Sequence, residues 1–172
     1  LKKLYKALNT NNFDLSNITS FEFINSERWD LLLKGNKKSI LGIGVGSPGV
    51  VSLKKGTVEN PPNLPGWGKV HLGKIISKEF SLPTFVENDA NAAAIGEFYY
   101  GKAKNMKDFI VITLGTGVGS GFVANRQLIY GHDSFAGELG HTIIVDEGRD
   151  CSCGRKGCLE TYASVSAVVR TA

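Results

Sequence analysis

The sequence lacks long hydrophobic runs, has few cysteines and carries little net charge, and each shortage argues against a class of protein. No apolar run in the 172 residues approaches the roughly 18 that a membrane-spanning helix needs, so we expect no membrane partner. The net charge is only +4 and the lysine pairs are scattered, which argues against a nucleic-acid partner. The three cysteines cannot all pair with one another, so we expect free thiols and a cytoplasmic protein rather than a secreted disulfide scaffold.

Glycine, by contrast, is abundant, with 21 residues against a usual share of about 7%. The excess lies in two clusters, residues 42–49 and 115–121, and clustered glycine indicates backbone that approaches another group closely. The second cluster offers several amide N–H groups after a strand, a geometry that receives phosphate oxygens. A strand is predicted to follow it, so neither the P-loop nor the Rossmann pattern applies, and a plain hairpin with glycine turns explains the cluster equally well.

Predicted strands alternate with predicted helices, which indicates an α/β fold. Apolar periodicity predicts buried strands over residues 40–45, 84–86 and 109–114, and hairpins over 50–58 and 122–130. It predicts helices over residues 1–8, 72–80 and 159–169, and an alanine-rich helix that opens near Asp89 and ends by Gly101. Small residues on one face of the alanine-rich helix, Ala90, Ala93 and Ala94 beside Phe98, allow close packing.

The expected domain organisation is two lobes joined near residues 102–107. Residues 1–103 form the N-terminal lobe, in which residues 1–39 have no firm assignment beyond the first helix. Residues 104–172 form the start of the C-terminal lobe.

All three cysteines fall within eight residues, in the pattern Cys151-x-Cys153-x4-Cys158. His141 stands ten residues before the first of them and is a natural fourth ligand, because a Cys3His set is a common tetrahedral shell for structural zinc. A histidine without metal is the alternative. If one ring nitrogen binds zinc, the other carries a proton and can donate to a substrate hydroxyl.

Several polar residues could bind and activate a substrate. Asp89 follows a strand end at a helix start, where ligands gather in α/β folds, and could act as a general base; an N-cap carboxylate is the alternative. Four other side chains have matched donor and acceptor capacity for vicinal hydroxyls, although each alone could be surface decoration: Asn63, Asn88, Glu138 and Glu160.

An ordered set of short motifs resembles the ROK family (repressors, open reading frames and sugar kinases), especially its bacterial glucokinases. The resemblance runs from about Ile40 to the end of the sequence. No single motif decides it, but the set with the cysteine block is specific: GVGSPG at 44–49, PNL at 62–64, ENDAN at 87–91, LGTGVG at 114–119, GELGH at 137–141 and CSCGRKGCLE at 151–160.

The resemblance implies an actin-like ATPase (ribonuclease H-like) fold, two lobes closing over a sugar, and a homodimer. It implies ATP-dependent phosphorylation of a hexose at its 6-hydroxyl, with glucose as the first candidate substrate. Asp89 would be the base and Mg the activator. By position it assigns the hexose to Asn63, Asn88, Glu138, His141 and Glu160, the ATP phosphates to Gly115, Thr116 and Gly117, and a structural zinc to His141, Cys151, Cys153 and Cys158.

Two departures from the family pattern bear on these expectations. The family's kinases open with an Asp-x-Gly-Gly-Thr loop, a string that this sequence does not contain, and they continue well past the position of Ala172. We therefore expect the middle part of a kinase, truncated at both ends. The alternatives are a sugar-responsive transcriptional repressor of the same family, a kinase for an N-acylhexosamine or fructose, and a zinc-stabilised binding module without catalysis.

Overall fold

A computed structural model describes residues 22–25, 40–61, 64 and 66–171. The chain divides into two compact units, Leu1–Asp89 and Ala90–Ala172. The lobe boundary that we place after residue 103 stays a prediction. The helix expected over residues 1–8 lies outside the described residues.

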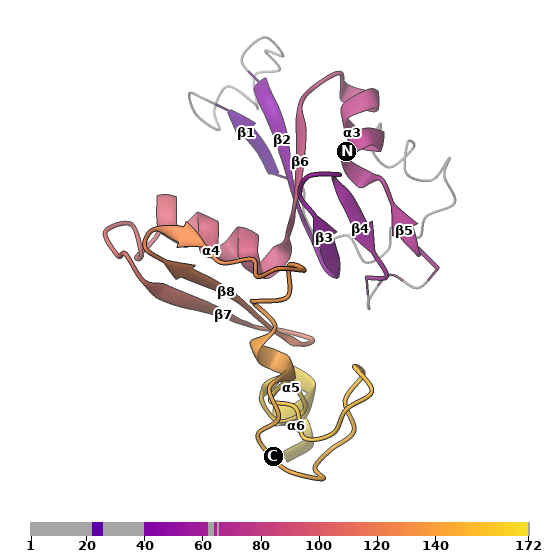
Figure 1. Cartoon of the computed structure of the whole chain (residues 1–172), viewed down its shortest axis with the longest axis vertical. Coiled ribbons are helices and arrows are strands. Elements are labelled where there is room, and N and C mark those ends of the chain that lie inside the picture. The colour runs from indigo at the N-terminus through magenta and orange to yellow at the C-terminus, as the bar shows by residue number, and fades with distance from the viewer. Residues whose placement is uncertain (1–21, 26–39, 62–63, 65, 172) are drawn as a thin grey trace. The chain divides into compact units, whose positions relative to one another are not determined.

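The first unit contains a mixed three-stranded sheet in the order β1-β2-β6 (Figure 1). Strand β1 (Glu22–Asn25) pairs antiparallel with β2 (Ile40–Ser47), and β2 pairs parallel with β6 (Thr84–Asn88). Ile43, Val45 and Val86 are buried, so the adjacent strands β2 and β6 both contribute apolar side chains to the core. The parallel register sets Ser47 opposite Asn88, so the carboxyl ends of β2 and β6 lie together.

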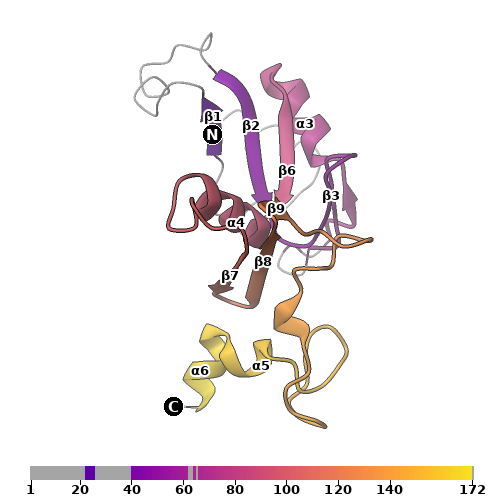
Figure 2. The ribbon, with the colours of Figure 1, turned by 60° about the vertical axis from the view of Figure 1, so that its left-hand side comes forward.

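The described residues of this unit also form a second, antiparallel sheet and a helix, and Figure 2 shows β6 beside the helix. The sheet consists of β3 (Val50–Ser52), β4 (Thr57–Glu59) and β5 (Lys69–Val70), and it is followed by helix α3 (Leu72–Phe80). The Gly73 N–H donates to the Gly56 carbonyl at 2.9 Å, which fixes the start of α3 against the β3–β4 turn. The fully buried side chains of Val58 and Ile76 belong to one hydrophobic core with β2 and β6.

The second unit is built on an antiparallel sheet of β7 (Phe109–Leu114), β8 (Val118–Ala124) and β9 (Gln127–Leu128). Helix α4 (Asp89–Tyr99) begins directly after β6 and lies along this sheet (Figure 1). A Cβ atom added at Gly121 would stand 2.5 Å from the Ala94 Cβ, and one added at Gly119 would stand 2.9 Å from the Ala90 Cβ. The prediction of a close-packing alanine face is therefore confirmed, and the glycines of β8 are what make that packing possible.

The glycine segment differs from expectation in one respect, because β8 already begins at Val118. We expected an irregular loop through Gly121, since glycine has a low strand propensity. Glycine is kept within the strand because α4 leaves no room there for a side chain.

The helix expected over residues 159–169 is also interrupted. It divides into α5 (Glu160–Ala163) and α6 (Val165–Thr171) at Ser164, whose backbone is extended with φ −67° and ψ 160°. The Ser164 hydroxyl accepts a hydrogen bond from the Ala167 N–H at 3.3 Å, so Ser164 caps the start of α6. Periodicity could not reveal this break, because the apolar spacing continues across it. No helix within the described part of the chain has the length and apolar character needed to cross a membrane.

Candidate functional site

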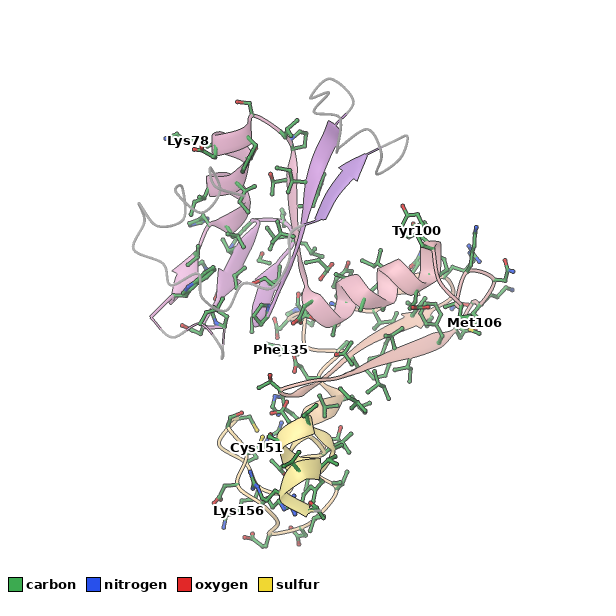
Figure 3. The ribbon with its side chains drawn as sticks, turned by 180° about the vertical axis from the view of Figure 1, so that it is seen from behind. Lys78, Tyr100, Met106, Phe135, Cys151 and Lys156 are labelled. Carbon is green, nitrogen blue, oxygen red and sulfur yellow. The ribbon has the colours of Figure 1, made fainter. Side chains whose placement is uncertain are left out.

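The four side chains predicted to bind a metal come together in the second unit. One ligand atom from each of His141, Cys151, Cys153 and Cys158 lies within 4.8 Å of all the others. Figure 3 labels Cys151 in the loop that carries the cysteines. His141 ends a short 3-10 helix, η2 (Leu139–His141), and is brought to this loop by the Leu159 N–H, which donates to the Thr142 carbonyl at 2.9 Å.

The cysteine loop, residues 151–158, begins with a tight turn that depends on one glycine. The Cys151 N–H donates to the Arg155 carbonyl at 2.9 Å, and the Gly154 N–H donates back to the Cys151 carbonyl at 3.0 Å. Gly154 closes the turn with φ +84°, a conformation that is costly for any residue with a side chain. The turn therefore holds Cys151 at its start and Cys153 within it, two residues apart.

Two distances in this cluster match those expected around a tetrahedral zinc ion. Zn–S bonds of about 2.3 Å and a Zn–N bond of about 2.05 Å give sulfur–sulfur separations of about 3.8 Å and sulfur–nitrogen separations of about 3.6 Å. The Cys153 and Cys158 sulfurs lie 3.7 Å apart, and the Cys151 sulfur lies 3.5 Å from His141 Nδ1. Soft thiolates with one imidazole are the ligand set that zinc prefers, so the donor chemistry fits as well.

The cysteines differ in how easily each loses its proton. The backbone N–H of Arg155, together with its guanidinium group, lowers the pKa of the Cys153 thiol to about 6. Burial has the opposite effect on Cys158 and raises its pKa to about 11. A cation that binds here meets one ready thiolate and must displace the proton of a buried thiol.

His141 has one ring nitrogen on each side of this site. Its Nδ1 faces the cysteines, whereas Nε2 lies 3.9 Å from Oε2 of Glu138, a half-exposed carboxylate. A metal on Nδ1 would leave the proton on Nε2, where it can be donated. The structure thus brings Glu138 close to the face of His141 that is turned away from the cluster.

Glu160 connects the segment after the cysteines to the glycine loop, which we define as Gly115–Val118. Its Oε2 accepts a hydrogen bond from the Val118 N–H at 2.9 Å. Within the described residues, no acceptor is paired with the N–H groups of Thr116 and Gly117. Thr116 is exposed, so the loop presents amide donors that an anion could reach.

The remaining predicted residues belong to the first unit. Asn88 ends β6, and its side-chain amide donates to the Gly49 carbonyl at 3.4 Å. Asp89 is the first residue of α4 and is exposed. Asn63 lies outside the described residues. That Asn88 and Asp89 share a pocket with Glu138, His141 and Glu160 stays a prediction.

Arg149 is a residue of this region that sequence reasoning missed. Its guanidinium group donates to the Thr161 carbonyl at 2.8 Å and lies 4.6 Å from the centre of the Tyr162 ring. Arg149 thereby fastens the cysteine loop to α5. In the sequence it is one arginine in a polar stretch, and no spacing marks it as structural.

The fold and the site together define an α/β protein in which a Cys3His cluster adjoins a glycine loop through Glu160. The sequence pattern of the ROK family matches residues 32–172, and the chain belongs to that family. It is 43% identical over 147 residues to a glucokinase from Halalkalibacterium halodurans, covering 83% of this chain and 44% of the relative. It is 42% identical over 147 residues to a xylose repressor from Caldicellulosiruptor bescii, covering 82% of this chain and 37% of the relative.

Solved structures agree with the fold. A ROK family glucokinase from Streptomyces griseus in complex with glucose and AMPPNP matches with a TM-score of 0.69 and 38% identity. That match covers 82% of this chain and 46% of the other. The expected actin-like ATPase fold class is thereby confirmed. The chain spans less than half the length of these relatives.

Proposed function

We propose that this chain is part of a ROK sugar kinase that transfers a phosphoryl group from ATP to the 6-hydroxyl of a hexose, with glucose as the first candidate. The observation that carries the proposal is the glycine loop, in which no acceptor among the described residues is paired with the Thr116 and Gly117 N–H groups. Glu160, which accepts from the Val118 N–H of this loop, lies two residues after the last cysteine of the Cys3His cluster. The glucokinase relative and the structural match that contains glucose and AMPPNP support the same activity. Phosphoryl transfer needs positioning and charge stabilisation more than covalent chemistry, and these are what such a site supplies.

In this proposal each group has one task. Asp89 accepts the proton of the 6-hydroxyl as it attacks the γ-phosphorus, and the amides of the glycine loop hold phosphate oxygens with Mg bound to the nucleotide. His141 donates from Nε2 to a sugar hydroxyl, and Glu138 accepts from another. The hexose-binding set is Asn63, Asn88, Glu138, His141 and Glu160.

A zinc ion would be held by His141, Cys151, Cys153 and Cys158. When bound, it supplies structural cross-linking and no reaction step. The cross-link fixes His141 at one end of the cysteine loop and Glu160 at the other, and this fixed separation is what sugar binding requires.

The xylose repressor relative supports a second candidate, a sugar-responsive transcriptional repressor, because it is nearly as similar as the glucokinase. Such a protein would keep the sugar-binding residues without needing phosphoryl transfer. A kinase for an N-acylhexosamine or for fructose is the neighbouring alternative within the first candidate. We further propose that the protein is a cytoplasmic homodimer, consistent with an ATP-dependent activity and reduced cysteines.

A coupled assay of ADP release tests the proposal. The purified protein is supplied with ATP and Mg and with glucose, fructose, N-acetylmannosamine or no sugar. We expect release that depends on glucose and exceeds the sugar-free background. Sugar binding measured by calorimetry without any sugar-dependent ADP release would instead support the repressor.

A further inference from the structure

We propose that Glu160 is a positioning residue for the glycine loop, in addition to the sugar-binding role proposed above. One carboxylate would then connect the sugar-binding residues to the loop that receives phosphate. That the loop receives phosphate rests on the proposed function. The contacts between Glu160 and the loop do not depend on it.

The first contact is the hydrogen bond from the Val118 N–H to Glu160 Oε2, at 2.9 Å. Val118 is 6% exposed, so water has little access to replace a lost acceptor. A buried N–H without a partner is unfavourable, and the carboxylate therefore holds the loop in place.

The second contact is steric. A Cβ atom added at Gly117 would overlap Oε2 of Glu160, although the backbone of Gly117 is not in the left-handed region. Any side chain at this position would therefore push the carboxylate out of its place against the backbone. The other oxygen, Oε1, would stand 3.9 Å from the same point, and no donor among the described residues is paired with it. Oε1 can therefore accept a hydrogen bond from a sugar hydroxyl while Oε2 keeps its hydrogen bond from the Val118 N–H.

The two ends of the glycine loop are held from one short segment. The Val165 N–H donates to the Gly115 carbonyl at 2.9 Å, five residues along from the carboxylate that holds Val118. The same segment begins two residues after Cys158, and the Thr161 hydroxyl donates to the Cys158 carbonyl at 2.8 Å. Displacement of the cysteine loop would thus move Glu160 and, with it, the glycine loop.

The functional consequence is coupling between the two substrates. A sugar that binds Oε1 restrains the carboxylate, and a restrained carboxylate keeps the Thr116 and Gly117 amides oriented for phosphate. Sugar should therefore increase nucleotide affinity, and linkage requires nucleotide to increase sugar affinity by the same factor.

Amide hydrogen exchange, followed by NMR on the 172-residue chain, tests the contact without any assay of activity. In Glu160→Ala the Val118 amide should exchange about tenfold faster, because a charge-assisted hydrogen bond is lost. Glu160→Gln should restore most of the protection, since its amide oxygen can still accept. Glu97→Ala is the matched control: its carboxylate accepts from the Lys102 N–H at 2.9 Å, and its loss should leave Val118 unchanged.

Unchanged protection of Val118 in Glu160→Ala would overturn the proposal. If that variant does not fold, Gly117→Ala provides the second test, because the added methyl group displaces the carboxylate. It should also speed exchange at Val118, while Ile112 and Ser120, paired within the β7–β8 ladder, stay protected. Equal protection of Val118 in Gly117→Ala and the native chain would likewise count against the proposal.

Binding of AMPPNP without sugar separates this role from a purely sugar-binding one. Glu160→Ala should weaken nucleotide binding about tenfold, and Glu160→Gln should weaken it far less. A residue that contacts only sugar would leave nucleotide affinity unchanged in both variants, and that result would refute the inference. If the native protein binds neither nucleotide nor glucose, the proposed function fails, but the Val118 exchange result still decides the positioning role.

Discussion

Cys153 is the exposed member of the Cys/His cluster, and its thiolate forms at a lower pH than an ordinary thiol because the Arg155 N–H stabilises the charge. Three sulfurs and one ring nitrogen, all within 4.8 Å of one another, match the four ligands of a tetrahedral zinc shell with none to spare. Each of the four side chains is therefore needed, and the exposed one can be removed with the least damage to packing.

Replacing Cys153 by alanine should release most of the bound zinc and weaken sugar binding. The loss follows because a three-ligand shell binds zinc more weakly, and because His141 and Glu160 lose their fixed separation. Metal content by plasma emission spectrometry and glucose affinity by calorimetry measure the two effects. Ser152→Ala, an exposed neighbour in the same loop, should change neither. Native zinc content in the Cys153 variant would show that the cluster is not the metal site.

Replacing Asp89 by asparagine should lower kcat by about 10²- to 10⁴-fold and leave glucose affinity largely intact, because asparagine keeps the shape but cannot accept the proton. Steady-state kinetics and calorimetry separate the two effects. Asp108→Asn is the control, since this exposed carboxylate accepts from the Asn125 N–H at 2.8 Å, a bond that an amide oxygen can also accept. Parallel losses of turnover and sugar binding would mean that Asp89 is structural.

At the level of single residues, the sequence was informative where the spacing of ligand residues is enough to predict a metal site. Cys151, Cys153 and Cys158 lie within eight residues of one another, so their convergence could be predicted from the pattern. The hydrogen bond between Glu160 and Val118 joins residues 42 positions apart and could not be predicted, because only the packed structure brings them together.

Among the elements, α4 and β8 pack so closely that the residues between them must be small. Gly119 and Gly121 face Ala90 and Ala94 with no space for an additional methyl group. The sequence predicted the small face of α4 from its alanines. It did not predict that residues 118–121 belong to a strand, because glycine-rich segments are usually loops. The strand is explained only by the packing of α4 against it.

Two Gly→Ala substitutions should therefore have opposite effects. Gly121→Ala overpacks this contact and should destabilise the protein by about 1–3 kcal/mol. Gly96→Ala lies within α4 with open space around it and should stabilise by about 0.5–1 kcal/mol, because glycine loses more backbone freedom in a helix. Urea unfolding followed by circular dichroism measures both. A Gly121 variant as stable as the native chain would refute the described packing.

For the whole molecule, the two compact units differ in what holds them together. The first has an extended apolar core that includes Ile43, Leu72 and Ile76, whereas the second contains the Cys/His cluster. Family membership could be predicted from the ordered motifs because they are spread over both units. Beyond the helix predicted over residues 1–8, the segment up to residue 39 could not be assigned from its sequence, since it carries little periodicity and none of these motifs.

Removal of the metal should consequently affect one unit and spare the other. After treatment with a zinc chelator, deuterium exchange measured by mass spectrometry should rise in peptides that cover residues 137–163. Peptides that cover residues 40–61 and 66–86 should be unchanged, because no cluster residue lies in them. Added zinc should reverse the effect and added magnesium should not. A uniform rise across the chain would mean that the metal stabilises both units.

The contact between α4 and β8 also limits how related chains can diverge. A larger residue at position 94 fits only if position 121 or its surroundings become smaller by the same volume. Glycine at position 121 has no side chain and cannot become smaller. Related chains should therefore exchange bulk between these two positions in matched steps, with a larger residue in the strand accompanied by glycine in the helix. Such paired exchange would record this helix–strand contact in sequences alone, without any structure of those proteins.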